Sequence, residues 1–497
     1  MGMTARARWW ALTAVSLATL MTYLDNNVIN VAIPTIQRSL HLSVTGLEWI
    51  VSSYLLVLAG LLLVGGRVAD VYGRRRVFLV GLAIFTLSSL TAGLAGSGGV
   101  LIGARAVQGL GAALLMPATL AIITHAFTDV RERTMAIGVW AAIGALGLAL
   151  GPVIGGVISQ HVHWGWIFLI NVPIGVITFA IALPFIAESR AEEPAGPRRQ
   201  ESRLRSLDIP GLITSATALF ALTYALIEGH DRGWTSALIL AAFAVSAVAL
   251  AAFLAIESRS EQPMVPLPLF RSREFSGGIS TMMIWAFGIF GIYFFTSLYL
   301  QSILGFSPTK AGLAFVPMAL AIALSATLAP RVAALIGGHR TVSVGVLLMV
   351  VGLILFAGLG GGVGYGSLMP GFLLFGLGGG LMNVPLTNSV LEAAPSAHAG
   401  IASALLNASR EVAGLLGVTV IGAVLRSRQS VAFRGGASPR DAFLDGYHTG
   451  LWLTIALLAT GVVLSYVTLR PRSQQQHDQR EAGHAPASVD RELVRDN

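Results

Sequence analysis

Long apolar runs recur along the whole chain, and they constrain its fold more than any other feature. Each run is close to the 20 residues that an α-helix needs to cross a hydrocarbon core roughly 30 Å thick. Only 11% of the 497 residues are charged, whereas a soluble protein carries about 25%. The pattern predicts an all-α polytopic membrane protein with fourteen transmembrane helices, at residues 10–34, 47–65, 77–96, 100–122, 135–158, 166–186, 209–227, 236–256, 276–298, 313–334, 341–359, 368–391, 400–425 and 449–469.

Arginines lie mainly in the segments between alternate spans, which indicates the orientation of the chain. An even number of spans places both termini on one side of the membrane. Arg8, the cluster Arg74–Arg76 and the segment Arg190–Arg205 all fall on that side, which is therefore expected to be cytoplasmic. Only the segment Arg426–Arg440, with four arginines on the expected outer side, disagrees. We expect a multi-pass protein of the cell membrane with both termini in the cytoplasm.

Several classes of function are disfavoured by what the sequence lacks. There is no cysteine, so disulfides and thiol-bound metals are excluded. We find no nucleotide-binding glycine loop, no histidine pair at metal spacing and no Ser-His-Asp set. The net charge of +8 comes mainly from arginines in the loops between spans, a distribution that does not indicate a nucleic-acid-binding surface. We therefore expect no enzyme activity, no metal, no cofactor and no nucleic-acid partner, and a process driven by an ion gradient.

Three short segments of the first half recur in the second half at a nearly constant separation. "GRVADVYGRRR" from Gly66 aligns with "PRVAALIGGHR" from Pro330, 264 residues later. "LHLSVT" matches "LGFSPT" at the same offset, and "GLGAAL" matches "GLGGGL". Two parallel six-helix bundles are expected, which is the organisation of alternating-access transporters. The expected parts are an N-terminal bundle (1–186), a cytoplasmic linker (187–208), two inserted transmembrane helices (209–256), a C-terminal bundle (257–470) and a disordered cytoplasmic tail (471–497).

Six motifs follow one another in a characteristic order and spacing. They are "LDNNVINVAIP" (24–34), "GRVADVYGRRR" (66–76), "RAVQGLGAA" (105–113), "GLALGPVIGG" (147–156), "WIFLINVPIG" (166–175) and "SPTKAGLAFVP" (307–317). Together they resemble the fourteen-helix drug:proton antiporters of the major facilitator superfamily. The resemblance implies the major facilitator fold and proton-coupled export of amphipathic small molecules, such as antibiotics or toxic natural products.

The first span carries a polar face in an otherwise apolar helix. Thr22, Asp25, Asn26 and Asn30 fall within an arc of about 140° on a helical projection. An ionised carboxylate in the bilayer costs at least roughly 2.5–3.5 kcal/mol, so such acids face a cavity and have a partner. This face is therefore expected to meet water, ligand or another polar side chain.

Arg105 of the fourth span is the expected partner of Asp25. Helix geometry places both side chains about 8 Å below the outer boundary of the membrane, and Gln108 lies one turn from Arg105 on the same side. A carboxylate whose distance from a cation changes during transport can bind and release a proton. We therefore expect Asp25 and Arg105 to couple transport to protons; the alternative is a static ion pair that orients two helices.

Further polar and aromatic residues are candidates for the wall of a central substrate cavity. Glu411 is a second acid near the middle of a span, and Arg410 beside it points about 100° away, so the two need not pair. Pairing of Glu411 with a neighbouring helix is the alternative, and core packing is the alternative for the aromatic residues. The expected cavity residues are Asn26, Asn30, Trp49, Tyr54, Gln108, Tyr293, Asn383 and Glu411. The tenth span lacks the acid that some relatives of this kind use for dicationic drugs, which argues against such substrates.

The turn after the second span is expected to form a cytoplasmic gate. Gly66 and Gly73 permit a tight backbone, and the resemblance implies that Asp70 docks onto the opposite bundle near Gly400. Asp129 at the end of the fourth span is a possible partner of Arg74. The alternative is that the arginines only set the topology.

A glycine series in the fifth span resembles the exporter motif of the family. Gly147, Gly151 and Gly155 repeat every four residues and form a flat groove for another helix. Pro152 permits a bend, and Gly156 extends the small-residue surface. The resemblance implies that this motif seals the outer side; the alternative is helix packing alone.

The leading hypothesis is therefore a monomeric proton-coupled antiporter whose partners are the lipid bilayer, protons and a small-molecule substrate. A dedicated exporter of one endogenous metabolite, siderophore or lipid is the alternative. A membrane sensor without transport activity is a third possibility, which the intact Asp25 and the glycine series disfavour.

Overall fold

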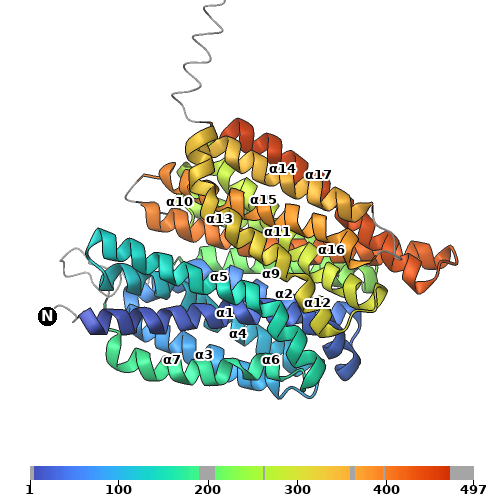
Figure 1. Cartoon of the computed structure of the whole chain (residues 1–497), viewed down its shortest axis with the longest axis horizontal. Helices are drawn as coiled ribbons and strands as arrows, with labels where there is room; N and C mark the ends of the chain where they lie inside the picture. The colour runs from blue at the N-terminus through green and yellow to red at the C-terminus, as the bar shows by residue number, and fades with distance from the viewer. Residues whose placement is uncertain (1–4, 190–207, 261–262, 359–363, 396–397, 471–497) are drawn as a thin grey trace, which may run out of the picture.

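The computed structural model describes residues 5–189, 208–260, 263–358, 364–395 and 398–470, and these residues form helices and short connections without a β-strand (Figure 1). Thirteen of the described helical segments are long and apolar enough to cross a membrane. The fourteenth, α1, carries the polar face described above, which lowers its hydropathy. The predicted fold class and the fourteen spans are confirmed.

The first six spans form the N-terminal bundle, which is blue to teal in Figure 1. Two more spans follow, and the last six form the C-terminal bundle, drawn in yellow to red. The N-terminal helices are α1 (Ala5–Leu40), α2 (Val44–Tyr72), α3 (Arg74–Gly93), α4 (Gly98–Ala126), α5 (Val130–His161), α6 (Trp166–Leu169) and α7 (Asn171–Phe185). The inserted helices are α9 (Ile209–Arg232) and α10 (Ala237–Arg259). The C-terminal elements are η1 (Leu267–Arg271), α11 (Arg273–Leu298), η2 (Tyr299–Ile303), α12 (Pro308–Ala314), α13 (Val316–Ile336), α14 (Gly338–Ala357), α15 (Tyr365–Glu392), α16 (Ala399–Arg434) and α17 (Pro439–Thr468).

The two bundles repeat one another in their packing. Helix α1 packs on α5 as α11 packs on α16, and α4 packs on α2 and α3 as α15 packs on α13 and α14. Gly109 of α4 and Gly376 of α15 occupy equivalent positions in the two halves. Each of them lies against a backbone carbonyl of a neighbouring helix. Gly73 and Gly337 close equivalent turns with positive φ values of 113° and 90°, a conformation that favours glycine. The repeat found in the sequence therefore extends to backbone conformation.

Two predicted spans are each divided into a short and a long helix. The sixth separates into α6 and α7, with Pro173 in the first turn of α7, and the tenth separates into α12 and α13, with Pro317 in the first turn of α13. Proline lacks the N–H that would continue the preceding helix, which explains both breaks. The predicted tail lies entirely outside the described residues, and so does most of the predicted linker.

The ends of the helices define two ends of the molecule. The terminal end carries the start of α1, the α2–α3 turn and the end of α17. The distal end carries the α1–α2, α5–α6 and α16–α17 connections. Hydrogen bonds between the bundles gather toward the distal end: Gln301 Nε2 donates to the carbonyl of Val31 at 2.9 Å, and the backbone N–H of Thr309 donates to Gln160 Oε1 at 3.1 Å. The two bundles are thus closed against each other at the distal end.

Candidate functional site

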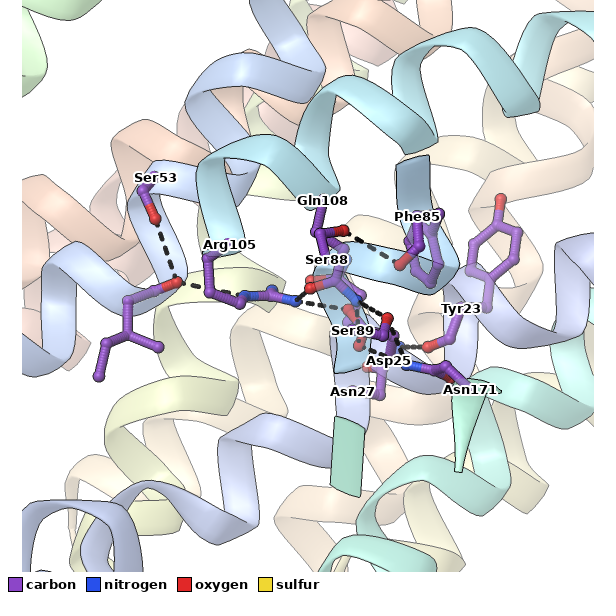
Figure 2. A network of polar contacts seen from close by, with 12 residues as sticks. Tyr23, Asp25, Asn27, Ser53, Phe85, Ser88, Ser89, Arg105, Gln108 and Asn171 are labelled. Carbon is purple, nitrogen blue, oxygen red and sulfur yellow. Dashed lines mark hydrogen bonds and ion pairs between the residues drawn. The ribbon is translucent and has the colours of Figure 1, made fainter. Parts of the chain in front are cut away.

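A buried ion pair lies in the middle of the N-terminal bundle. Arg105 Nη1 of α4 lies 2.5 Å from Asp25 Oδ2 of α1, and both side chains are fully buried. Figure 2 shows the guanidinium group pointing from α4 toward the carboxylate. The sequence predicted this contact from the equal depth of the two residues. It forms because Asp25, at one edge of the polar face of α1, points toward α4 rather than toward lipid.

The second oxygen of the Asp25 carboxylate accepts two further hydrogen bonds. Gln108 Nε2 and Asn171 Nδ2 each donate to Oδ1 at 2.8 Å. The same two amides also contact Ser89 Oγ, at 2.7 and 3.4 Å, so four helices meet at one acid (Figure 2). A buried ion pair is stable only where further hydrogen bonds satisfy the remaining polar atoms. This network satisfies both oxygens of the Asp25 carboxylate, while Arg105 Nη2 and Asn171 Oδ1 have no hydrogen-bond partner among the described residues.

Sequence reasoning missed Ser89 and Asn171. Asn171 is the sole amide in the stretch Trp166–Phe185, which was a usable signal, because a polar side chain in such a span needs a partner. Ser89 gave no such signal, since serine satisfies itself within a helix.

Arg105 is held by an aromatic ring on its other side. The ring of Tyr54 on α2 lies 4.2 Å from Arg105 Cζ, and that of Phe168 lies 5.6 Å away. Arg105 Nε donates to the carbonyl of Ile50 at 3.4 Å. Cation–π contacts of this kind stabilise a desolvated cation. Tyr54 is therefore part of the wall around the ion pair.

A cavity lined by residues of both bundles lies between them. Helices α1, α2, α4, α5, α11, α13 and α16 contribute to its wall. Five of the predicted cavity residues line it: Asn26, Asn30, Tyr54, Tyr293 and Glu411. Trp285 and Phe290 add further aromatic surface.

Three predicted cavity residues lie elsewhere. Trp49 faces α9, where its Nε1 donates to Glu228 Oε1 at 3.0 Å. Gln108 is fully buried in the network around Asp25. Asn383 lies on α15, which packs on α13 and α14 and contributes nothing to the cavity wall. Helical periodicity alone could not show which neighbouring helix each of these three side chains would contact.

Glu411 and Arg410 form a charged pair in the cavity wall. Arg410 Nη2 lies 2.7 Å from Glu411 Oε1 and also donates to the hydroxyl of Tyr23 on α1 at 3.3 Å. The two residues are adjacent on α16, and the long arginine side chain folds back to reach the acid. The contact with Tyr23 joins the two bundles at the cavity.

The glycine series of α5 serves two different helices. A Cβ atom at Gly147 would lie 2.9 Å from the carbonyl oxygen of Leu20 on α1. A Cβ atom at Gly151 would lie 2.5 Å from Asn27 Cβ, also on α1. Gly156 instead meets the backbone of Pro308, where α12 begins. The series therefore packs α1 within its own bundle, and its distal end contacts the opposite bundle.

The α2–α3 turn is held within the N-terminal bundle. Asp70 Oδ1 lies 3.0 Å from Nη2 of Arg74, four residues later. Gly73 leaves room for the side chain of Glu188, whose Oε1 accepts a hydrogen bond from the N–H of Arg75 at 3.2 Å. The expected docking of Asp70 onto α16 is not part of this conformation, in which the bundles meet toward the distal end.

The possible pairing of Asp129 with Arg74 is not present in this conformation, in which Arg74 pairs with Asp70. Asp129 is the N-cap of α5, and its Oδ1 accepts a hydrogen bond from the N–H of Glu132 at 2.9 Å. Aspartate is a favoured N-cap residue because it satisfies an N–H that has no partner within the helix.

The sequence model of the Major Facilitator Superfamily matches residues 15–418. The chain belongs to the major facilitator superfamily. It is thus a multi-pass membrane transporter by family, and the cavity between its bundles occupies the place where transporters with parallel repeats bind their substrates.

Similar members of the superfamily are named as resistance and export proteins. The chain is 33% identical to the puromycin resistance protein pur8 of Streptomyces alboniger, over 97% of this chain and 95% of that one. It is 35% identical to the multidrug resistance protein Stp of Mycobacterium tuberculosis, over 84% of this chain and 76% of that one. It is 34% identical to the tetracenomycin C resistance and export protein of Streptomyces glaucescens, over 86% and 77%.

Solved structures of the superfamily share the fold at low sequence identity. The POT family transporter PepTSo superposes with a TM-score of 0.67 at 14% identity, over 93% of this chain and 98% of that one. A bacterial homologue of the lysosomal transporter Spinster superposes with a TM-score of 0.64 at 16% identity, over 94% and 98%.

Proposed function

We propose that this chain is a proton-coupled antiporter that exports amphipathic small molecules of the antibiotic class from the cell. The observation that carries the proposal is that the Tyr54 ring lies over Arg105 of the Asp25–Arg105 pair and also lines the cavity shared by the bundles. A proton-binding group and a substrate site that share a wall can affect each other. The named relatives support the antibiotic class.

The terminal end is assigned to the cytoplasm, because Arg8 near the start of α1 and the arginines of the α2–α3 turn lie there. Closure at the distal end then corresponds to the inward-facing state, in which the cavity receives substrate from the cell. Export requires the distal end to open and the terminal end to close.

Asp25 is assigned the role of proton carrier. Arg105 supplies its countercharge, and Gln108 and Asn171 donate hydrogen bonds to it. A change in its distance from Arg105 during transport would couple that movement to proton binding and release. Tyr54 would transmit the presence of substrate, because a molecule in the cavity touches the ring that covers Arg105.

The cavity favours polar aromatic molecules over strongly charged ones. Arg410 and Glu411 balance each other in its wall, and the Asp25 charge is balanced behind Tyr54. Asn26 and Asn30 offer neutral hydrogen-bonding groups, and Trp285 and Tyr293 offer flat surfaces for stacking.

Uptake into inverted membrane vesicles tests the proposal. Vesicles that contain the protein receive an imposed pH gradient, acidic inside, together with a panel that includes puromycin and tetracenomycin C. We expect gradient-dependent accumulation of at least one compound, and loss of that accumulation when an uncoupler dissipates the gradient. Accumulation that persists after the gradient is removed would contradict proton coupling.

A dedicated exporter of one compound is a second candidate. Several relatives are named for a single antibiotic, among them puromycin and tetracenomycin C, whereas Stp is named for multidrug resistance. The same vesicle panel separates the two: competition among chemically unrelated compounds supports broad export, and transport of one compound alone supports the dedicated carrier.

A further inference from the structure

A second buried ion pair lies near the distal end and joins the two bundles. Arg426 Nη2 of α16 lies 3.0 Å from Glu48 Oε2 of α2, and the side chains are 5% and 0% exposed. Gly422 of α16 makes room for the acid, since any Cβ atom there would overlap with the Glu48 carboxylate. Arg426 is also the first arginine of the segment that disagreed with the positive-inside pattern. Its burial explains part of that disagreement.

The pair is extended by a hydroxyl bridge to the inserted helix α9. Arg426 Nη1 donates to Thr45 Oγ1 at 2.9 Å, and Thr45 Oγ1 donates to Asp231 Oδ2 at 2.6 Å. Arg426 Nη2 also donates to the carbonyl of Leu226 on α9 at 3.4 Å. Helix α9 therefore contacts both bundles at the point where the ion pair crosses between them.

A further bond fastens α9 to the N-terminal bundle. Trp49, one residue after Glu48, donates to Glu228 Oε1 at 3.0 Å, and its ring lies against those of Phe220 and Tyr224. This explains why Trp49 lies away from the cavity.

The Glu48–Arg426 pair differs from the Asp25–Arg105 pair in a decisive way. Asp25 and Arg105 belong to the same bundle, so their contact can persist when the bundles move. Glu48 and Arg426 belong to opposite bundles, so opening of the distal end must separate them. Separation of a buried pair leaves charges without partners, which is costly unless water enters.

We infer that Glu48, Arg426, Thr45 and Asp231 form a distal latch that stabilises the closed distal end, with α9 as a strap across the two bundles. The inference rests on the proposed alternating-access function, and it assigns a role to the inserted helix. In this role the latch sets how often the protein opens to the distal side.

Double electron–electron resonance on the full chain tests the latch. The native sequence has no cysteine, so spin labels at Val162→Cys and Arg434→Cys are the sole labels and report the distance between the bundles at the distal end. Neutralising both partners in the variant Glu48→Gln/Arg426→Gln should raise the population with the longer distance about tenfold, which corresponds to 1.4 kcal/mol. Thr45→Val, which removes no charge, should shift the distribution in the same direction by less.

The ion pair between Arg8 and Glu132 provides the matched control. It lies at the terminal end within the N-terminal bundle, with an N–O distance of 2.7 Å, so Arg8→Gln/Glu132→Gln should leave the distal distance unchanged. An unchanged distribution in the latch variant, or an equal shift in the control, would overturn the inference. Should the double variant not be recovered as folded protein, Thr45→Val decides, and no shift in that variant overturns the latch. The measurement needs neither gradient nor substrate, so its failure is distinct from failure of proton-coupled export.

Discussion

Three donors surround the carboxylate of Asp25, and all of them come from the N-terminal bundle. Arg105 supplies the countercharge, while Gln108 and Asn171 donate neutral hydrogen bonds. A change in the protonation of Asp25 therefore acts first on α1, α4 and α7. Transport has to carry this local change to the cavity, and Tyr54 is the side chain that contacts both Arg105 and the cavity.

Replacement of Arg105 by lysine tests the geometry of the pair rather than its charge. Lysine cannot reproduce the planar guanidinium that bonds Asp25 and Gln108 and stacks on Tyr54. We expect gradient-driven transport to fall at least about tenfold and the stability of the protein to fall by about 1–3 kcal/mol. Transport assays and thermal unfolding measure the two effects. Arg428→Lys, an exposed arginine on α16, serves as control; comparable losses in both variants would argue against a special geometry at Arg105.

Tyr54 tests the connection between the two sites. Tyr54→Phe keeps the ring over Arg105, so coupling should persist, whereas Tyr54→Ala removes the wall between the cavity and the ion pair. We expect Tyr54→Ala to admit water to Asp25 and to show a proton leak without substrate, several times that of the wild type. Dissipation of a pH gradient in proteoliposomes measures the leak. Equal leaks from the two variants would contradict the role of the ring.

The sequence predicted those site residues whose depth in the membrane and position around the helix axis can be calculated. It did not predict contacts between helices that are far apart in the chain. Asp25, Arg105 and Gln108 were found because depth and phase can be computed along a single helix. Glu48 and Arg426 drew no attention as a pair, because Glu48 lies at a span boundary, where acids are common, and its partner lies in the other half of the chain. Pairing of Arg410 with Glu411 depends on a side-chain conformation that spacing does not determine.

At the scale of single helices, α5 shows how one glycine series can serve both packing and closure. Gly155 presses against the carbonyl of Val28 on α1, and Gly156, the next residue, presses against Pro308 of the opposite bundle. Successive residues point about 100° apart on a helix, so one helix can contact both neighbours. Motion of α12 relative to α5 must therefore disrupt this contact, together with the close approach of Gly312 to the carbonyl of Pro152.

Alanine substitutions along α5 distinguish the effect of these close contacts on stability from the effect of helix propensity. Gly155→Ala would place its Cβ against the Val28 carbonyl, whereas Gly138→Ala has open space within 4 Å. We expect Gly155→Ala to destabilise the protein by about 1–3 kcal/mol and Gly138→Ala to be neutral or to stabilise it by up to about 1 kcal/mol. Thermal unfolding of the two variants in one detergent gives the comparison. Destabilisation of equal size in both would contradict the close α1–α5 packing.

The existence of the helices was more predictable than their boundaries. Apolar length identified all fourteen spans, but the breaks after α6 and α12 were not predicted, although Pro173 and Pro317 stand close to them. Proline is tolerated in membrane helices when neighbouring helices satisfy the freed backbone groups, so the sequence alone could not decide between a bend and a break.

At the scale of the whole molecule, the proposed proton site and the proposed substrate site have different locations. The Asp25 network lies inside one bundle, while the cavity and the Glu48–Arg426 pair lie between the two. A proton can therefore change one bundle while substrate and latch respond to the relation between both. This division agrees with alternating access, in which two fairly rigid halves move around a central site.

Asp25→Asn provides the most direct test of the central proposal, that Asp25 couples proton movement to export. Asparagine keeps the size of the side chain but cannot release a proton, so we expect accumulation driven by a pH gradient to fall to background while substrate exchange at equilibrium continues. Both are measured with labelled substrate in the same proteoliposomes. Asp445→Asn, an exposed acid on α17, should leave both activities unchanged. Gradient-driven accumulation at the wild-type level in Asp25→Asn would contradict the proposal.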